Sequence, residues 1–236
     1  FSWTRFFESQ GVTGIEKFSL ATPDFHQEVS AMLGDTDPAV WRSCLRCHTV
    51  DGAAPYLSDA FANERFNFYN NKLSGQKEIE ARWKRVLGTI EGQAGEALGQ
   101  MYVKVAFSPE SKAKMETLVA NLGAALKDRI QGLEWMSDET KAKAQEKQAA
   151  FTTKIGYPDK WREWNGLATS RDSYIGNVLA AQEFNYKFDL GKIGKPVDKT
   201  EWGMPPQMVN AYYNPFQNEI VFPAAILQPP FFDPDA

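Results

Sequence analysis

The sequence lacks the features that mark membrane-spanning and nucleic-acid-binding chains. None of its apolar runs approaches the roughly 18 residues that a helix needs to cross a bilayer. Acidic residues outnumber basic ones, 30 against 26, so the net charge is −4 with neutral histidines. Such a balance provides no positive surface for nucleic acid or an anionic membrane. Internal repeats of solenoid length and low-complexity tracts are also missing, which leaves a globular chain of mixed charge.

The sequence also lacks a secretory signal segment, and its first residue is Phe1 rather than an initiator methionine. At the other end it stops at Ala236, directly after an apolar run. We therefore expect both ends to be internal positions of a longer protein. On that expectation, the missing signal segment says nothing about where the protein is located.

Composition and local signals predict a mainly helical chain. The sequence is 43% hydrophobic and 13% aromatic, which is enough for a core. Capping residues followed by proline predict helices that begin after Asp37 and Ser108, and Ser137 with two following acids predicts a third. Further helices are expected from Gln76 towards residue 107 and over residues 172–184, with a turn at 155–159.

Towards the end of the chain, the sequence pattern changes from helical to β-rich. Two short β-rich runs, Val209–Tyr213 and Glu219–Phe222, flank a turn at Asn214-Pro215 and predict a hairpin. Glycine and proline concentrate between residues 191 and 206 and mark a connection. The predicted fold is therefore mainly α, with a helical module over residues 1–206 and a short β-hairpin in residues 207–236.

The hairpin and the apolar, proline-rich run after it resemble one family closely. The segments 208–215, which includes Asn210-Ala211-Tyr212, and 218–232 are similar to the substrate-binding segment of the neprilysin and endothelin-converting-enzyme family of zinc metalloendopeptidases. Other segments resemble the same family in the same order, namely residues 41–46, 54–58, 82–85, 98–103, 107–108, 133–141 and 154–158. The resemblance implies a helical N-terminal cap domain, incomplete at its start, followed by the beginning of the catalytic domain.

The family's zinc motif, H-E-x-x-H, is not found in this sequence. In the family the two histidines and a later glutamate bind zinc, and the glutamate of the motif is the general base. The only histidines here are His26 and His48, and neither begins such a motif. The resemblance thus implies that the intact protein binds zinc through ligands outside this chain. It also implies that the chain alone holds no catalytic or metal-binding residue and is inactive.

The resemblance implies substrate-binding roles for Asn210, Ala211, Tyr212, Ile226 and Phe231. In the family, an edge strand at the first three positions pairs with extended peptide, whose backbone groups satisfy those of the strand. Ile226 and Phe231 match positions that line an apolar pocket for the residue after the scissile bond. The alternatives are core packing for Ile226 and Phe231, and a polar residue next to a turn for Asn210.

The same resemblance implies the partners and the location of the protein. The expected partners are peptide substrates and the remainder of the catalytic domain, and no nucleic acid is expected. The expected location is extracytoplasmic, which covers the periplasm, secretion and membrane anchoring; whether the protein is anchored to a membrane stays open.

The sequence is also compatible with two alternative functions. Cys44-Leu45-Arg46-Cys47-His48 fits C-x-x-C-H, the attachment signature of c-type haem, with His48 as the axial ligand. The same two cysteines could form a disulfide or be two buried thiols. The other alternative is a non-catalytic module that binds peptides through the edge strand.

Overall fold

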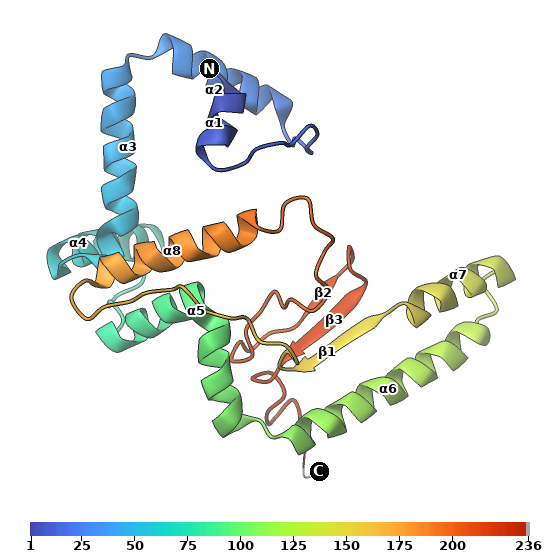
Figure 1. The fold of residues 1–236 in the computed structure, drawn as a ribbon. Helices are drawn as coiled ribbons and strands as arrows, with labels where there is room; N and C mark the ends of the chain where they lie inside the picture. Colours follow the sequence, from blue (N-terminus) through green and yellow to red (C-terminus); the bar gives the residue numbers. More distant parts are fainter. Residues whose placement is uncertain (235–236) are drawn as a thin grey trace. The chain divides into compact units, whose positions relative to one another are not determined.

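A computed structural model describes residues 1–234, and its contacts divide the chain into two compact units (Figure 1). Unit 1 comprises residues 1–85 and 166–195, and unit 2 comprises residues 86–165 and those from 196 onward. These units are defined by packing. The domain boundary near residue 206 concerns the modules of the longer protein, so it stays a prediction; residues 235–236 of its second domain lie outside the described chain.

Unit 1 is helical. Its elements are α1 (Trp3–Ser9), α2 (Pro23–Asp35), α3 (Pro38–Ala53), the 3₁₀-helix η1 (Ala54–Tyr56), α4 (Asp59–Arg65), the π-helix η2 (Phe66–Leu73) and α8 (Tyr174–Leu190). The Trp3 indole donates to Ser30 Oγ at 2.9 Å and joins α1 to α2. The Tyr186 hydroxyl donates to the Gln10 carbonyl at 2.6 Å and joins α8 to the end of α1.

Unit 2 combines helices with a small sheet. Its elements are α5 (Arg82–Ala106, of which residues 82–85 belong to unit 1), α6 (Pro109–Gln131), α7 (Asp138–Ala149), β1 (Thr152–Gly156), β2 (Tyr212–Asn214) and β3 (Glu219–Pro223). The path of α5 bends at Ala94, whose φ of −140° and ψ of 39° are not helical. Helix α6 packs against both α7 and β1, as Figure 1 shows.

The capping signals of the sequence are confirmed. Asp37 accepts a hydrogen bond from the Ala39 N–H at 2.7 Å, and Ser108 and Ser137 accept from the N–H groups three residues on. Each such cap stabilises a helix by about 1 kcal/mol. Three bounds differ from the prediction: the helix expected from Gln76 starts at Arg82, and the helix expected over residues 172–184 runs from Tyr174 to Leu190.

The three strands form one sheet in the order β1-β3-β2. β1 pairs parallel with β3, and β2 pairs antiparallel with β3 through the predicted hairpin. The fold class is confirmed as mainly α with a small β element. The structure corrects one prediction, since a turn was expected from Ile155. Instead β1 runs to Gly156, because residues 152–156 pair with residues 219–223, which lie far along the chain.

The first strand of the hairpin begins later than predicted. The predicted run was Val209–Tyr213, whereas β2 covers Tyr212–Asn214. Before it, the Asn210 N–H donates to the Met208 carbonyl at 3.0 Å, and Asn210 Oδ1 accepts from the Ala211 N–H at 2.8 Å. These local bonds compete with strand pairing, so the ladder starts only at Tyr212.

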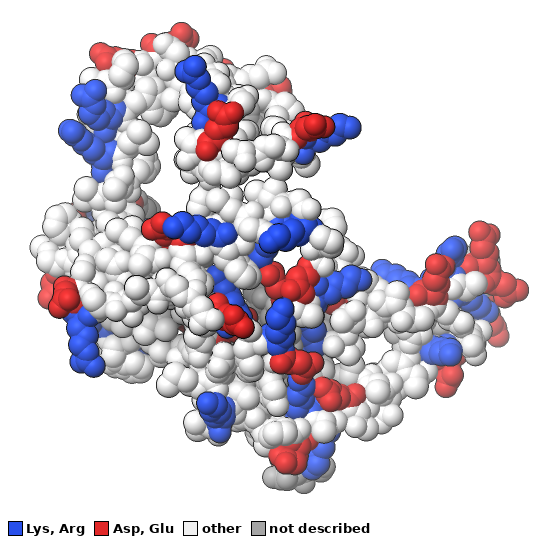
Figure 2. All heavy atoms as spheres, viewed as in Figure 1, with Lys and Arg blue, Asp and Glu red and all other residues white. Residues whose placement is uncertain are grey.

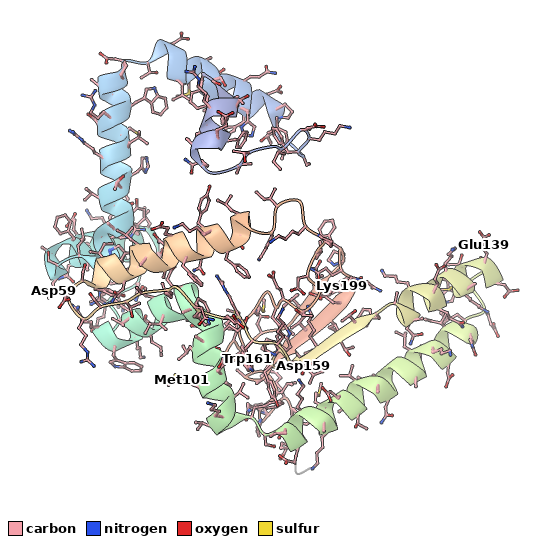
Figure 3. All side chains as sticks on the ribbon, viewed as in Figure 1. Asp59, Met101, Glu139, Asp159, Trp161 and Lys199 are labelled. Atoms are coloured by element: carbon pink, nitrogen blue, oxygen red, sulfur yellow. The ribbon has the colours of Figure 1, made fainter. Side chains whose placement is uncertain are left out.

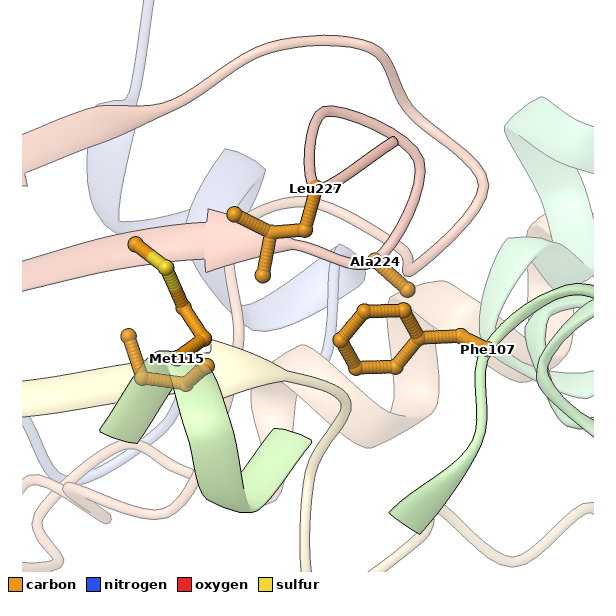
Figure 4. Packing of buried hydrophobic residues seen from close by; sticks show 5 residues of the cluster. Phe107, Met115, Ala224 and Leu227 are labelled. Carbon is orange, nitrogen blue, oxygen red and sulfur yellow. The ribbon is translucent and has the colours of Figure 1, made fainter. Parts of the chain in front are cut away.

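The core of unit 2 joins the sheet to the helices around it. Phe107, Met115, Ile155, Ala224 and Leu227 form a buried cluster, most of which is labelled in Figure 4. Gly156 lies against this cluster with φ of +75°, and a Cβ there would come within 2.6 Å of the Phe107 ring. Only glycine satisfies both conditions, which explains the residue at the end of β1.

The surface carries both charge signs. On the face drawn in Figure 2, basic and acidic groups are interspersed. Apolar side chains are exposed as well, among them Met101, which projects from α5 in Figure 3. Within residues 1–234, no helix has both the length and the apolar character needed to cross a membrane.

Candidate functional site

The residues predicted to bind substrate all lie in unit 2, either at or just before the start of β2 or in the segment that follows β3. In the described chain β3 is the only strand partner of β2, so β2 is an edge strand. An edge strand presents backbone groups that a further extended segment can pair with. Asn210 and Ala211 immediately precede this strand, and Tyr212 opens it.

Asn210 is exposed and keeps one end of its amide available. Its Oδ1 accepts from the Ala211 N–H, whereas Nδ2 has no hydrogen-bond partner among residues 1–234. An amide NH₂ carries two donors, so Asn210 can donate to a carbonyl presented beside the strand. Ala211 is half-buried, and its N–H is held by the Asn210 side chain. The bond between the two residues orients the Asn210 amide.

Tyr212 is the half-buried member of the three. Its hydroxyl oxygen accepts from the Gly203 N–H at 2.8 Å. Burial raises the pKa of the Tyr212 phenol above its ordinary value, the Glu219 carboxylate raises it further, and the Gly203 hydrogen bond opposes the rise. Burial disfavours the phenolate, so the hydroxyl stays protonated at neutral pH. The phenol group is therefore bound to its own chain.

Ile226 and Phe231 have different environments. Ile226 is half-buried and packs against the core cluster of unit 2, whereas Phe231 is 73% exposed. The pocket-lining role inferred for both from the resemblance stays a prediction. In this chain Ile226 contributes to the core, while the Phe231 ring offers a large apolar surface.

The segment that carries Ile226 is firmly anchored. The Ala224 N–H donates to the Gly156 carbonyl at 2.8 Å, and the Ala225 N–H donates to the Pro206 carbonyl at 2.9 Å. Gln228 Nε2 donates to the Ala106 carbonyl at 2.8 Å. These bonds tie residues 224–228 to β1, to the connection before β2 and to the end of α5, so the segment has a fixed position within unit 2.

A buried ion pair beside the strand was missed by sequence reasoning. Lys154 Nζ lies 2.7 Å from Glu219 Oε2, with exposed fractions of 8% and 2% for the two residues. Lys154 also donates to the Glu201 carbonyl at 2.7 Å. The sequence showed one sign of this pair, an acidic residue, Glu219, at the first position of a predicted strand. Its partner, Lys154, lies in a segment that was not predicted to be a strand.

The described residues do not fit a zinc site. Residues 1–234 contain no group of three or more His, Cys, Asp or Glu side chains that could hold a metal ion. The His26 ring packs edge-on against Trp3, with ring centroids 5.4 Å apart, and His48 is exposed on α3. Zinc binding needs three or four converging ligands, which these two histidines do not provide.

Cys44 and Cys47 are free and exposed on α3, so the prediction of two buried thiols is wrong. The reason is that α3 has no buried residue in this structure. Cys47 lines an open, mostly apolar cavity of about 520 Å³ in unit 1, which Phe61 and Phe68 also line. Next to it, the Arg65 guanidinium lies 2.7 Å from Asp51, and its hydrogen bond lowers the pKa of that carboxyl.

Comparison with known proteins agrees with the sequence resemblance. A neprilysin of Mus musculus is 31% identical over 246 residues, which cover 98% of this chain and 33% of the relative. An endothelin-converting enzyme homolog of Locusta migratoria is 32% identical over 250 residues, covering 98% and 34%. The chain thus spans about a third of the length of these relatives.

A solved structure has the same fold. The cryo-EM structure of zinc metalloprotease Zmp1 of Mycobacterium tuberculosis in its open state matches with a TM-score of 0.90 and 40% identity, covering 100% of this chain and 37% of that one. Models of peptidase family M13 match residues 1–158 and residues 210–236, and the second match includes the candidate strand. The first match alone covers more than half of the chain, and on this evidence the chain belongs to peptidase family M13.

Proposed function

We propose that the longer protein is a zinc-dependent endopeptidase that hydrolyses internal bonds of peptides, and that this chain supplies the strand that holds the peptide. One observation carries the proposal: β2 is an edge strand, and the exposed Asn210 immediately before it has an Nδ2 without a partner among the described residues. Family membership supports the reaction class, because the structural relative Zmp1 is itself called a zinc metalloprotease.

In this proposal an extended peptide lies beside residues 210–212. Asn210 donates through its side-chain Nδ2, and the backbone carbonyl of Ala211, whose N–H is already bonded to Asn210, accepts from the peptide backbone. Both contacts are made to groups that every peptide has, so they bind substrate without regard to sequence. The proposed substrate-binding residues also include Tyr212, Ile226 and Phe231. Of these, Ile226 and Phe231 select the peptide side chain that follows the scissile bond.

Zinc belongs to the longer protein in this proposal, through ligands outside residues 1–234. The metal would supply the activated water of the family's reaction. The residues of this chain bind and orient the peptide, so the chain alone is expected to be inactive. An extracytoplasmic location is part of the same proposal, and fractionation of the producing cells tests it.

Replacing Asn210 with alanine in the full-length enzyme tests the proposed strand. The change removes one or two hydrogen bonds to the peptide backbone, each contributing roughly 1–1.5 kcal/mol, so kcat/KM should fall about 10- to 100-fold. Since the contact is to backbone, the loss should be similar for peptides of unrelated sequence. The measurement is kcat/KM for several peptides, with zinc content determined for each preparation.

Two further variants sharpen this test. Asn67→Ala deletes the same side chain at an exposed position in unit 1 and should leave kcat/KM unchanged. Ile226→Ala should instead harm peptides with a large apolar residue after the scissile bond more than those with a small one. If Asn210→Ala stays within about twofold of the parent for every peptide, with zinc and folding intact, the strand assignment is wrong.

The C-x-x-C-H segment is expected to carry no haem. It lies inside the part of the chain that matches the peptidase family, and the family match accounts for its flanks without a cofactor. After expression in a host that matures cytochromes c, the protein should lack a pyridine haemochrome band and keep the mass of the polypeptide. A mass gain of one haem that disappears in Cys44→Ala/Cys47→Ala would contradict this expectation.

A further inference from the structure

The pairing of the sheet places three polar side chains on one face. Lys154 of β1 and Tyr212 of β2 are both in register with Val221 of β3. Glu219 precedes Val221 by two positions, and residues two apart on a strand point to the same face. Lys154, Glu219 and Tyr212 therefore lie on the same side of the sheet, one from each strand.

A short segment crosses this face and is bound at both ends. The Glu201 carbonyl accepts from Lys154 Nζ at 2.7 Å, and the Gly203 N–H donates to the Tyr212 hydroxyl at 2.8 Å. The Lys154 ammonium is in turn fixed by its buried ion pair with Glu219. Residues 201–203 thus connect β1, and through its ion pair β3, to β2 by side-chain hydrogen bonds.

The backbone of Gly203 lies close to the Tyr212 side chain. A Cβ added there would come within 3.2 Å of the Tyr212 hydroxyl oxygen, which is tighter than ordinary contact. Backbone and phenol can approach this closely because the residue is glycine. The phenol hydroxyl consequently already has a partner on this face, so it is not directed at a peptide that pairs along the outer edge of the strand.

We propose that Tyr212 is a positioning residue, which holds the peptide-binding strand in place through Gly203, with Lys154 and Glu219 as the fixed support of that segment. The inference rests on the proposed function and changes the role of one of its residues. Tyr212 acts through the strand, whereas Asn210 contacts the peptide.

The reason for such a support lies in the shortness of the strand. β2 has three residues and, among residues 1–234, a single strand partner. Short edge segments open locally at low free-energy cost. A strand that must be ordered when the peptide binds loses affinity by the cost of that ordering. The hydrogen bond from Gly203 to Tyr212 keeps the strand ordered before the peptide arrives.

Tyr212→Phe in the full-length enzyme tests this role, because it removes the hydroxyl and keeps the ring. KM should rise about 3- to 10-fold, the effect of one hydrogen bond, while kcat stays within about twofold. The matched control is Tyr186→Phe, which deletes the same atom from a residue of α8 in unit 1, whose hydroxyl donates to the Gln10 carbonyl at 2.6 Å. KM should not change in that variant.

The double variant Asn210→Ala/Tyr212→Phe separates positioning from general stability. If Tyr212 acts through the strand, its loss should matter less once the Asn210 contact is gone, so the two effects should combine to less than their product. Effects that multiply, or a Tyr212→Phe variant equal to the parent, would overturn the inference while leaving Asn210 as a substrate contact. A silent Asn210→Ala would instead overturn the proposed strand, and this inference with it.

Discussion

Replacing Lys154 with methionine is expected to weaken the sheet of unit 2 by about 3–5 kcal/mol, since it leaves the buried Glu219 carboxylate without its partner. Glu219 is only 2% exposed, so water cannot replace the lost ammonium group. The backbone amides of β1 and β3 should exchange with solvent correspondingly faster. Hydrogen exchange of residues 152–156 and 219–223 in the full-length protein measures the effect locally.

An exposed ion pair provides the matched control. Lys143 Nζ lies 2.8 Å from Glu146 Oε2, but these side chains are 74% and 70% exposed. Lys143→Met should therefore change stability by less than about 0.5 kcal/mol. Replacing both buried partners, as in Lys154→Met/Glu219→Leu, should recover much of the loss because no uncompensated charge remains. Equal effects of Lys154→Met and Lys143→Met would show that the buried pair is not a support of the sheet.

Phe107→Ala is expected to destabilise unit 2 by a similar amount, about 3–5 kcal/mol, through the cavity that it creates. Phe107 is 4% exposed and belongs to the buried cluster of Figure 4, directly against Gly156. Phe107→Leu, which leaves a smaller cavity, should lose less. The measurement is again hydrogen exchange of β1, together with the thermal midpoint of the full-length protein.

The control for this core variant is another phenylalanine of the same unit. Phe216, in the turn between β2 and β3, is 99% exposed. Phe216→Ala should alter stability by no more than about 0.5 kcal/mol. If the two alanine variants had the same stability, the buried cluster would not be the core that joins the sheet to α5 and α6.

Much of the fold could be predicted because its signals are local. The caps at Asp37, Ser108 and Ser137 act within four residues of themselves, so the sequence alone located these helix starts. The hairpin was equally visible, because its two strands are joined by a short turn. The order of family-like segments along the chain indicated the family, and the comparisons confirm it.

The position of the candidate residues was also accessible from the sequence, whereas their environments were not. Asn210, Ala211 and Tyr212 were identified through resemblance, and the structure shows that Asn210 is exposed while the Tyr212 hydroxyl is held by Gly203. No local pattern predicts that hydrogen bond, because it depends on how a glycine- and proline-rich connection folds over the sheet.

What the sequence determined by itself is the helical class, the hairpin and the family, because each depends on neighbouring residues or on the order of short motifs. Only the tertiary structure decided that Thr152–Gly156 is a strand and that Lys154 pairs with Glu219. Those features depend on parallel pairing between segments far apart in the chain. A five-residue strand has too short a pattern to be recognised until its partner lies beside it.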